Sequence, residues 1–269
     1  MTELPDELVD MNDDPEILIE SCVTGGIAEL TLNHPSSRNA LTIDMRTELA
    51  CLLSSAVEDP AIRAIVISAE GKVFCSGGDL KSMTRETAAS MLARQLNVQN
   101  LIRLLITGNT PVIAVVDGIC IGAGLSLALA CDIVVAGPSA KFAAVFGSVG
   151  LAPDLGMTWT LPARVGLGRA RLMTMTNRMV NAREAVEWGL ADIEADEALK
   201  TARKVAEEIC NNAPLSNGIV KKCFATHPAS LEQALRFEAL AQTVMHSTND
   251  FQEGFLAFKQ KRTPQFKGN

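Results

Sequence analysis

Three closely spaced glycines near the middle of the chain mark a turn that could bind negative charge. The apolar run Val112 to Val116 has the length and composition of a buried strand. It is followed by Gly118, Gly122 and Gly124, and then by an Ala/Leu-rich helical segment, residues 125–130. The first residues of such a helix have backbone N–H groups without helical partners, which suits them to an anion. The residue types alone are equally compatible with a tight strand-to-helix junction that binds no ligand.

Two common functions of a glycine turn are excluded here by single residues. The dinucleotide-binding pattern GxGxxG requires glycine at position 127, which is Leu127. The nucleophile elbow GxSxG requires glycine at position 128, which is Ala128, and no histidine lies nearby in the sequence to activate Ser126. The turn is therefore not predicted to bind a dinucleotide or to carry a nucleophilic serine.

The composition predicts a globular protein with a large core. The length of 269 residues suggests one large domain, or one domain with an appendage. Apolar residues make up 48% of the chain and charged residues 20%, so extensive disorder is not expected. The formal net charge of −7 argues against binding to nucleic acid or to an anionic membrane surface. An anionic ligand would therefore have to be held by a few local basic groups and N–H donors.

The cysteines and histidines predict neither disulfides nor a metal site. The seven cysteines are odd in number, scattered and free of CxxC spacing, which is typical of reduced, mostly buried thiols in the cytosol. The three histidines lie far apart in the sequence. We see neither an apolar run of membrane-spanning length nor a basic and apolar leader. We therefore expect a cytoplasmic protein with no metal and no membrane contact.

The predicted elements repeat in the order strand, strand, helix rather than in a plain βα alternation. A Gly25-Gly26 turn between two apolar runs predicts a hairpin. Thr42 is positioned to cap the helix that follows. From Asp196 onward the pattern is helical, with breaks at Pro214, Pro228 and about Asn249. The expected hairpin strands are residues 17–22 and 27–32, the next strand is 64–68, and the early helices are 43–57 and 87–107.

A second glycine motif, FCSGGDL from Phe74 to Leu80, precedes the central turn. The pair of motifs at this separation resembles the enoyl-CoA hydratase/isomerase (crotonase) superfamily, and the likeness extends from about Ile17 to the C-terminus. The closest pattern is that of isomerase branches such as the 1,2-epoxyphenylacetyl-CoA isomerase branch. These branches resemble this chain in the segment from Gly150 to Arg164 and in the tail from Lys261 to Gly268.

This resemblance implies an α/β fold, a crotonase-like spiral of ββα turns with a helical C-terminal region. The implied divisions are an N-terminal arm, residues 1–15, a spiral core, residues 16–200, and a C-terminal helical trimerisation region, residues 201–269. The C-terminal helices also carry more apolar residues than a few isolated helices could bury. We therefore expect these helices to pack on the spiral core and on a neighbouring subunit, in a homotrimer or a dimer of trimers.

The resemblance further implies an acyl-CoA thioester as the bound partner, with coenzyme A as part of the substrate and no separate cofactor. The amides of Gly78 and Ala123 would hold the thioester oxygen while it becomes negative. Arg38 suits the CoA phosphates because a guanidinium binds phosphate in a bidentate fork, although a solvated surface arginine is the simpler alternative. The full set of implied substrate-binding residues is Arg38, Ala40, Ser76, Leu80, Ser126, Phe146, Phe258 and Lys259.

Two departures from the family pattern bear on the reaction. Hydratases of the superfamily use two glutamates, at the positions of Ser126 and Phe146 in this chain, so hydration by that pair is not available. The nearest carboxylate in the sequence is Asp154, which isomerase branches with the same Pro-Asp pair use to move a proton. Its sequence neighbours are apolar, which would raise its pKa and favour a base that carries an α-proton. Alternatively, Asp154 merely caps a helix that starts near Leu155.

The sequence thus leaves two main hypotheses of different classes. The first is an enoyl-CoA isomerase in which Asp154 is the single proton carrier. The second is a non-catalytic acyl-CoA binding protein that kept the glycine turn and lost its acids. An enoyl-CoA hydratase with atypical acid and base residues is a more remote alternative. The direction of the Asp154 side chain, toward the thioester or toward solvent, should distinguish the first two.

Overall fold

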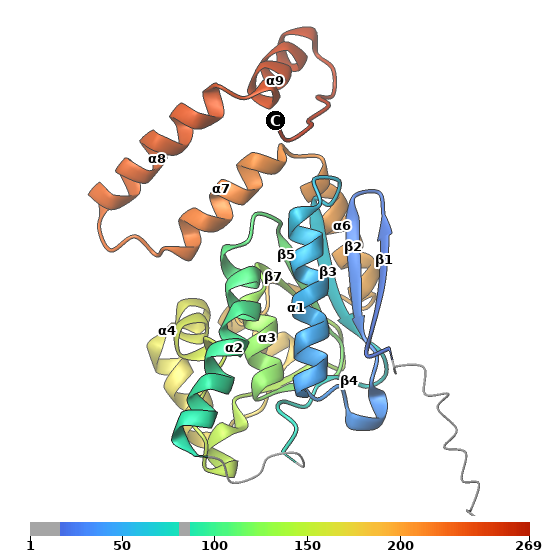
Figure 1. The fold of residues 1–269 in the computed structure, drawn as a ribbon, viewed down its shortest axis with the longest axis vertical. Coiled ribbons are helices and arrows are strands. Elements are labelled where there is room, and N and C mark those ends of the chain that lie inside the picture. The colour runs from blue at the N-terminus through green and yellow to red at the C-terminus, as the bar shows by residue number, and fades with distance from the viewer. Residues whose placement is uncertain (1–16, 81–86) are drawn as a thin grey trace, which may run out of the picture.

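The computed structural model describes residues 17–80 and 87–269, so the expected arm of residues 1–15 lies outside the described residues. Two sheets and the helices around them form the described part (Figure 1). The strands are β1 Ile19–Thr24, β2 Ile27–Leu32, β3 Ala64–Ala69, β4 Val73–Cys75, β5 Val112–Val116, β6 Ile119–Ile121, β7 Ile133–Ala136, β8 Lys141–Ala143, β9 Val180–Asn181 and β10 Ile193–Glu194. The helices are η1 Pro35–Ser37, α1 Ile43–Glu58, α2 Ala88–Thr107, α3 Ala123–Ala130, η2 Val145–Val149, α4 Met157–Thr176, α5 Ala182–Trp188, α6 Ala198–Cys210, α7 Pro214–Ala225, α8 Leu231–His246 and α9 Asn249–Gln260.

From β3 to β8, successive strands alternate between the two sheets. The larger sheet has the order β1-β2-β3-β5-β7-β10 and the smaller one the order β4-β6-β8-β9. The chain passes from β3 to β4 and α2, then from β5 to β6 and α3, and then from β7 to β8 and α4. Apart from the antiparallel pairs β1·β2 and β8·β9, the strands pair in parallel. This repetition confirms the expected spiral of ββα turns.

The larger sheet is buried on both faces, which explains why its central strands are apolar along their whole length. One face packs with α1, α2 and α3 into the main core, which includes Leu49, Ile65 and Leu105. The other face packs against α6, whose small residues Ala202 and Ala206 permit a close approach. The expected boundary between residues 200 and 201 falls inside α6, so the helix that covers this face continues past it.

A side-chain cap defines the start of α1, as the sequence predicted, and a second one defines the start of α2. The hydroxyls of Thr42 and Thr87 accept the N–H groups of Met45 and Ser90, which satisfies one free donor at each helix start. Helix α4 begins at Met157 and contains one non-helical residue. Gly166 has φ 76° and ψ 159°, so α4 consists of two helical pieces joined at this glycine.

The helices α7, α8 and α9 form an arm that stands off from the sheets (Figure 1). Helix α7 contacts α2, but α8 buries none of its residues, so the expectation that it packs on the core of its own chain is wrong. The C-terminal tail folds back on α9, where the buried Asp250 carboxylate accepts the N–H groups of Lys267 and Gly268 at 2.7 and 2.8 Å. Among the helices that the structure describes, none is both long and apolar enough to cross a bilayer.

Candidate active site

The two glycine motifs meet at the carboxyl ends of β4 and β6. A Cβ atom on Gly77 would lie 3.3 Å from the Ile121 carbonyl oxygen and 3.6 Å from the Ala123 nitrogen. A Cβ on Gly124 would lie 2.5 Å from the Cys75 carbonyl oxygen, closer than any side chain tolerates. Gly77 also has φ 101°, in the region that favours glycine. The glycines therefore allow the backbone of residues 76–78 to lie directly against the start of α3.

Two backbone N–H groups beside this contact make no hydrogen bond to any described residue. They belong to Gly78 and to Ala123, the first residue of α3. The neighbouring Leu41 N–H donates to the Gly77 carbonyl oxygen at 2.8 Å and fixes the loop. Both residues line a small cavity of about 40 Å³, which we call the glycine-loop cavity. It is lined by Leu41, Thr42, Ile43, Arg46, Gly78, Asp79, Arg94, Gln95, Ala123, Asp154 and Leu155.

Asp154 reaches this cavity from the loop before α4. Its Oδ2 lies 3.5 Å from the Gln95 Nε2 donor, whereas Oδ1 is buried and accepts no hydrogen bond within the described chain. Burial raises the pKa of the Asp154 carboxyl, while the hydrogen bond from Gln95 and the charge of Arg46 oppose the rise. Helix α4 begins after Gly156 with no side-chain cap, so Asp154 is not the cap of this helix. Asp154 thus lines the same cavity as Gly78 and Ala123, and one of its oxygens has no hydrogen-bond donor within the described chain.

The turn that carries Asp154 is strained and is held in place from α3. Leu155 has φ 51°, a conformation that costs a bulky side chain about 1–3 kcal/mol. The Ser126 hydroxyl, which is fully buried, donates to the Asp154 carbonyl oxygen at 3.0 Å. We expected Ser126 to bind substrate; in the structure its hydroxyl contacts the backbone of the loop that positions the carboxylate.

We expect Ser126→Ala to lower kcat more than acyl-CoA affinity, because it loosens the Asp154 turn. The hydroxyl also has a longer contact, 3.4 Å to the Gly122 carbonyl oxygen, on the peptide that carries the Ala123 N–H. The lost hydrogen bond should also lower the free energy of unfolding by about 1 kcal/mol. Steady-state kinetics and thermal unfolding measure the two effects. Ser247→Ala is the control, since the Ser247 hydroxyl donates to the Val244 carbonyl oxygen in the distant arm. Unchanged kcat in Ser126→Ala would show that the turn keeps its geometry without this hydroxyl.

The sequence and the fold were compared with those of known proteins. A model of the enoyl-CoA hydratase/isomerase family matches residues 23–269. The chain belongs to this family. It is 34% identical to 1,2-epoxyphenylacetyl-CoA isomerase of Escherichia coli (strain K12), with 93% of this chain and 98% of that one covered. It is 33% identical to carnitinyl-CoA dehydratase of Proteus mirabilis (strain HI4320), over 91% and 96% of the two chains.

The fold gives the same assignment. The crystal structure of an enoyl-CoA hydratase from Bacillus anthracis matches with a TM-score of 0.89 and 29% identity. The match covers 94% of this chain and all of that one. Relatives named isomerase, dehydratase and hydratase are thus all similar to this chain. The chain thus belongs to an enzyme family whose members are named for different reactions, so family membership alone does not fix the reaction.

Four of the residues that the family resemblance places around CoA lie next to the glycine-loop cavity. The Arg38 carbonyl oxygen accepts the Ser76 N–H at 3.1 Å, so these two segments run side by side. Arg38 and Leu80 are exposed, Ser76 is half-buried and Ala40 is buried. The structure brings Arg38 and Ser76 together, and Ala40 and Leu80 directly adjoin the cavity residues Leu41 and Asp79 in the chain. Contact of these residues with CoA stays a prediction.

The other expected substrate-binding residues lie elsewhere. Phe146 is 6% exposed in η2, where its ring is part of the main core and does not line the glycine-loop cavity. Phe258 and Lys259 lie on α9, and Lys259 Nζ lies 4.2 Å from the centre of the Phe255 ring. Phe258 is 84% exposed. Within one chain, the described structure does not bring either C-terminal residue to the glycine-loop cavity.

Sequence reasoning missed three residues that face Asp154 or share its cavity. Arg46 lies on α1, and Arg94 and Gln95 lie on α2. All three line the glycine-loop cavity, and Gln95 contacts the carboxylate directly. In the sequence they are ordinary polar positions on predicted helices, with no motif to mark them. Only the packing of α1 and α2 over the start of α3 reveals their role.

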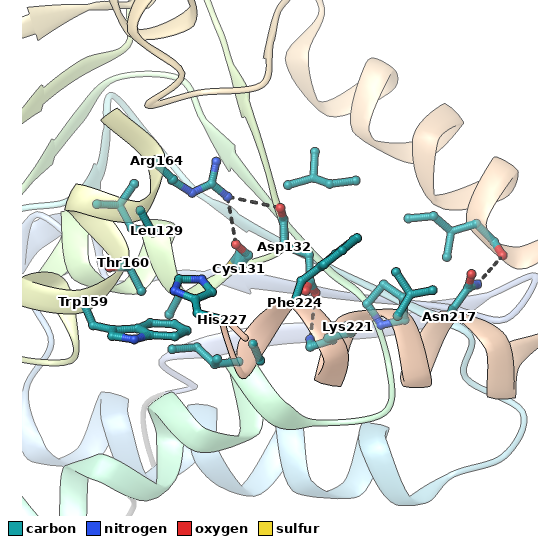
Figure 2. Close-up of a pocket in the computed structure, with 18 residues that line it drawn as sticks. Leu129, Cys131, Asp132, Trp159, Thr160, Arg164, Asn217, Lys221, Phe224 and His227 are labelled. Carbon is teal, nitrogen blue, oxygen red and sulfur yellow. Dashed lines mark hydrogen bonds and ion pairs between the residues drawn. The ribbon is translucent and has the colours of Figure 1, made fainter. Parts of the chain in front are cut away.

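A larger cavity of about 460 Å³ lies between α4, α7 and the end of α3 (Figure 2). Its polar groups already have partners. Lys221 Nζ donates to Asp132 Oδ2 at 2.7 Å and to the Thr110 carbonyl oxygen at 2.9 Å, and the Arg164 guanidinium donates to the Cys131 carbonyl oxygen at 3.0 Å. Trp159 stacks on the His227 ring. These contacts attach the arm to the core, and we assign no chemistry to this cavity.

Proposed function

We propose that the protein is an enoyl-CoA isomerase that shifts a double bond in an acyl-CoA thioester. The Gly78 and Ala123 amides hold the thioester oxygen as an enolate forms, and Asp154 moves the proton. Asp154 takes one proton from C2 of a 3-enoyl-CoA and returns it to C4, so the double bond moves from C3–C4 to C2–C3. The number of electrons and protons in the substrate is unchanged. The reaction therefore needs no redox group, and CoA is part of the substrate.

The observation that carries this proposal is the buried Asp154 Oδ1, which has no hydrogen-bond partner in the described chain, on a residue that lines the same cavity as Gly78 and Ala123. Burial raises the pKa of the carboxyl, which suits a base that must accept an α-proton. The macrodipole of α3 strengthens the Ala123 N–H as a donor to negative charge. Together these groups stabilise an enolate and supply one proton carrier.

Hydration is disfavoured because it needs a second group that activates and delivers water. The two positions that carry glutamates in the family's hydratases are Ser126, whose hydroxyl contacts the Asp154 backbone, and Phe146, whose ring is buried in the core. Asp79 is a second carboxylate that lines the glycine-loop cavity. The contribution of Asp79 to proton transfer can be separated from that of Asp154 by substituting each residue in turn.

The proposal is tested by incubating the protein with 3-enoyl-CoA thioesters of several chain lengths. We expect the absorbance of the conjugated 2-enoyl thioester to rise while the product mass equals the substrate mass. A product heavier by one water molecule would identify a hydratase. Binding of acyl-CoA without turnover of any enoyl substrate would instead support the non-catalytic binding protein.

We also propose that the exposed apolar side chains of the arm are covered by a neighbouring subunit, in a homotrimer or a dimer of trimers. Leu231, Leu240 and Val244 on α8 are between 57% and 71% exposed, which is unusual for side chains of this kind along one helix. We expect light scattering to give the mass of three or six chains. A monomer alone at micromolar concentration would contradict this assembly.

A further inference from the structure

Arg46 is a half-buried cation that the proposed proton transfer does not use. It lies one turn into α1, and its Nε donates to the Thr42 carbonyl oxygen at 3.2 Å. No carboxylate of residues 17–80 or 87–269 lies within ion-pair distance of its guanidinium. A guanidinium has five N–H donors. Most of the hydrogen-bonding capacity of Arg46 is therefore not used by the described chain.

The position of Arg46 connects two cavities. It lines the glycine-loop cavity, and it also lines a cavity of about 580 Å³ between α1 and α2, which we call the α1–α2 groove. Ile43 and Arg94 line both cavities as well, so the two adjoin. The groove is lined by Ile43, Arg46, Thr47, Ala50, Cys51, Ser54, Arg94, Val98, Asn100 and Leu101. Among residues 17–80 and 87–269, its charged lining residues are two arginines, and no acidic residue lines it.

The electrostatics at this junction favour an anion. The pKa of the Arg46 guanidinium is lowered, first by burial and then by the positive charge of Arg94, and Asp154 offsets only part of this. An anion bound to the half-buried Arg46 guanidinium would offset the cost of its burial. A carboxylate is matched to a guanidinium in shape, because it can accept two parallel N–H bonds.

We propose that the acyl group of the substrate ends in a carboxylate, which Arg46 binds in the α1–α2 groove. This inference rests on the proposed function, since it places the thioester at Gly78 and Ala123 and continues the acyl chain past Asp154. The apolar side chains of the groove contact the methylene groups of the tail. The substrate class is then the CoA monothioesters of unsaturated dicarboxylic acids.

A second cavity, of about 380 Å³, is an alternative binding site for the acyl tail. It also adjoins Asp154, and it is lined by Gln95, Gln99, Ile102, Arg103, Asp154, Leu155 and Gly156. Its arginine, Arg103, is exposed and donates to Gln99 Oε1 at 2.7 Å. The groove with the half-buried Arg46 is the better site for a carboxylate, and Arg103 provides a matched control.

The test compares two saturated acyl-CoA thioesters of equal chain length, one ending in a carboxylate and one in its methyl ester. Calorimetry measures the affinity of each for the wild-type protein and for Arg46→Gln, Arg46→Lys and Arg103→Gln. We expect the wild type to bind the carboxylate roughly tenfold to a hundredfold more tightly, the usual effect of a hydrogen bond to a charged group. Arg46→Gln should abolish this preference, Arg46→Lys should keep part of it, and Arg103→Gln should keep it in full.

Equal affinity of the wild type for the two thioesters would overturn the proposal. An Arg46→Gln variant that lowers the affinity for both thioesters equally would also overturn it, because Arg46 would then contribute to binding without recognising the end of the acyl tail. Loss of the preference in Arg103→Gln but not in Arg46→Gln would place the tail in the other cavity. Binding of saturated thioesters needs no turnover, so a protein that shows the preference but isomerises nothing would contradict the proposed function and leave this inference intact.

Discussion

Asp154→Asn lowers kcat for double-bond migration by at least about 10²- to 10⁴-fold, if Asp154 is the proton carrier, because asparagine cannot accept a proton at neutral pH. The amide keeps the shape of the carboxyl group, and the Gly78 and Ala123 donors are untouched. The affinity for a saturated acyl-CoA should therefore change little. The absorbance of the conjugated product gives kcat, and calorimetry gives the affinity.

Asp79→Asn is the matched comparison, because Asp79 is the other carboxylate that lines the glycine-loop cavity. Near wild-type turnover by Asp154→Asn, together with loss of turnover in Asp79→Asn, would assign the base to Asp79. The pH profile adds an independent check. Since the base works in its ionised form, kcat/KM should rise with pH. Because burial raises the Asp154 pKa, the midpoint of this rise should lie above the ordinary carboxyl value of 3.8.

Ala123→Pro should lower kcat/KM by roughly 10²- to 10³-fold, the usual effect of removing one donor from an oxyanion hole. Proline has no N–H, so it deletes the backbone donor that no side-chain change can remove. Ala123 is the first residue of α3, where a proline fits because the N–H has no helical partner and the fixed φ of proline suits the first turn of a helix. The fold should therefore survive a change that disables the site.

Ala123→Ser is the control, since it alters the side chain and keeps the N–H. Circular dichroism and the thermal midpoint should show that both variants fold. A folded Ala123→Pro variant with near wild-type kcat/KM would exclude the Ala123 amide from the reaction. Equal losses in the proline and serine variants would attribute the effect to crowding by the side chain.

Much of the fold could be predicted because the signals are local. The apolar strand Val112–Val116, the Thr42 cap and the breaks at Pro214 and Pro228 each act within a few residues, and the structure has the expected elements at these places. The four strands β7 to β10 had not been predicted. They are two to four residues long, and their pairing with distant strands, not their composition, makes them strands.

The site could be predicted only in part, for the same reason. The glycines have a backbone role that is visible in the sequence, because a close approach or a positive φ requires their residue type. The contact of Ser126 with the Asp154 carbonyl oxygen joins residues 28 positions apart, and the contact of Gln95 with the carboxylate joins residues 59 positions apart. No local pattern indicates such contacts. Arg46 was missed likewise, since a cation on a helix is usually solvated.

A crystal structure with a bound saturated acyl-CoA tests the central claim most directly. The account predicts that the thioester oxygen lies about 3 Å from both the Gly78 and the Ala123 nitrogen. It also predicts that an oxygen of Asp154 lies over the acyl chain, within reach of both C2 and C4. A thioester oxygen bound away from these amides, or an Asp154 carboxylate turned from the acyl chain toward solvent, would contradict the account.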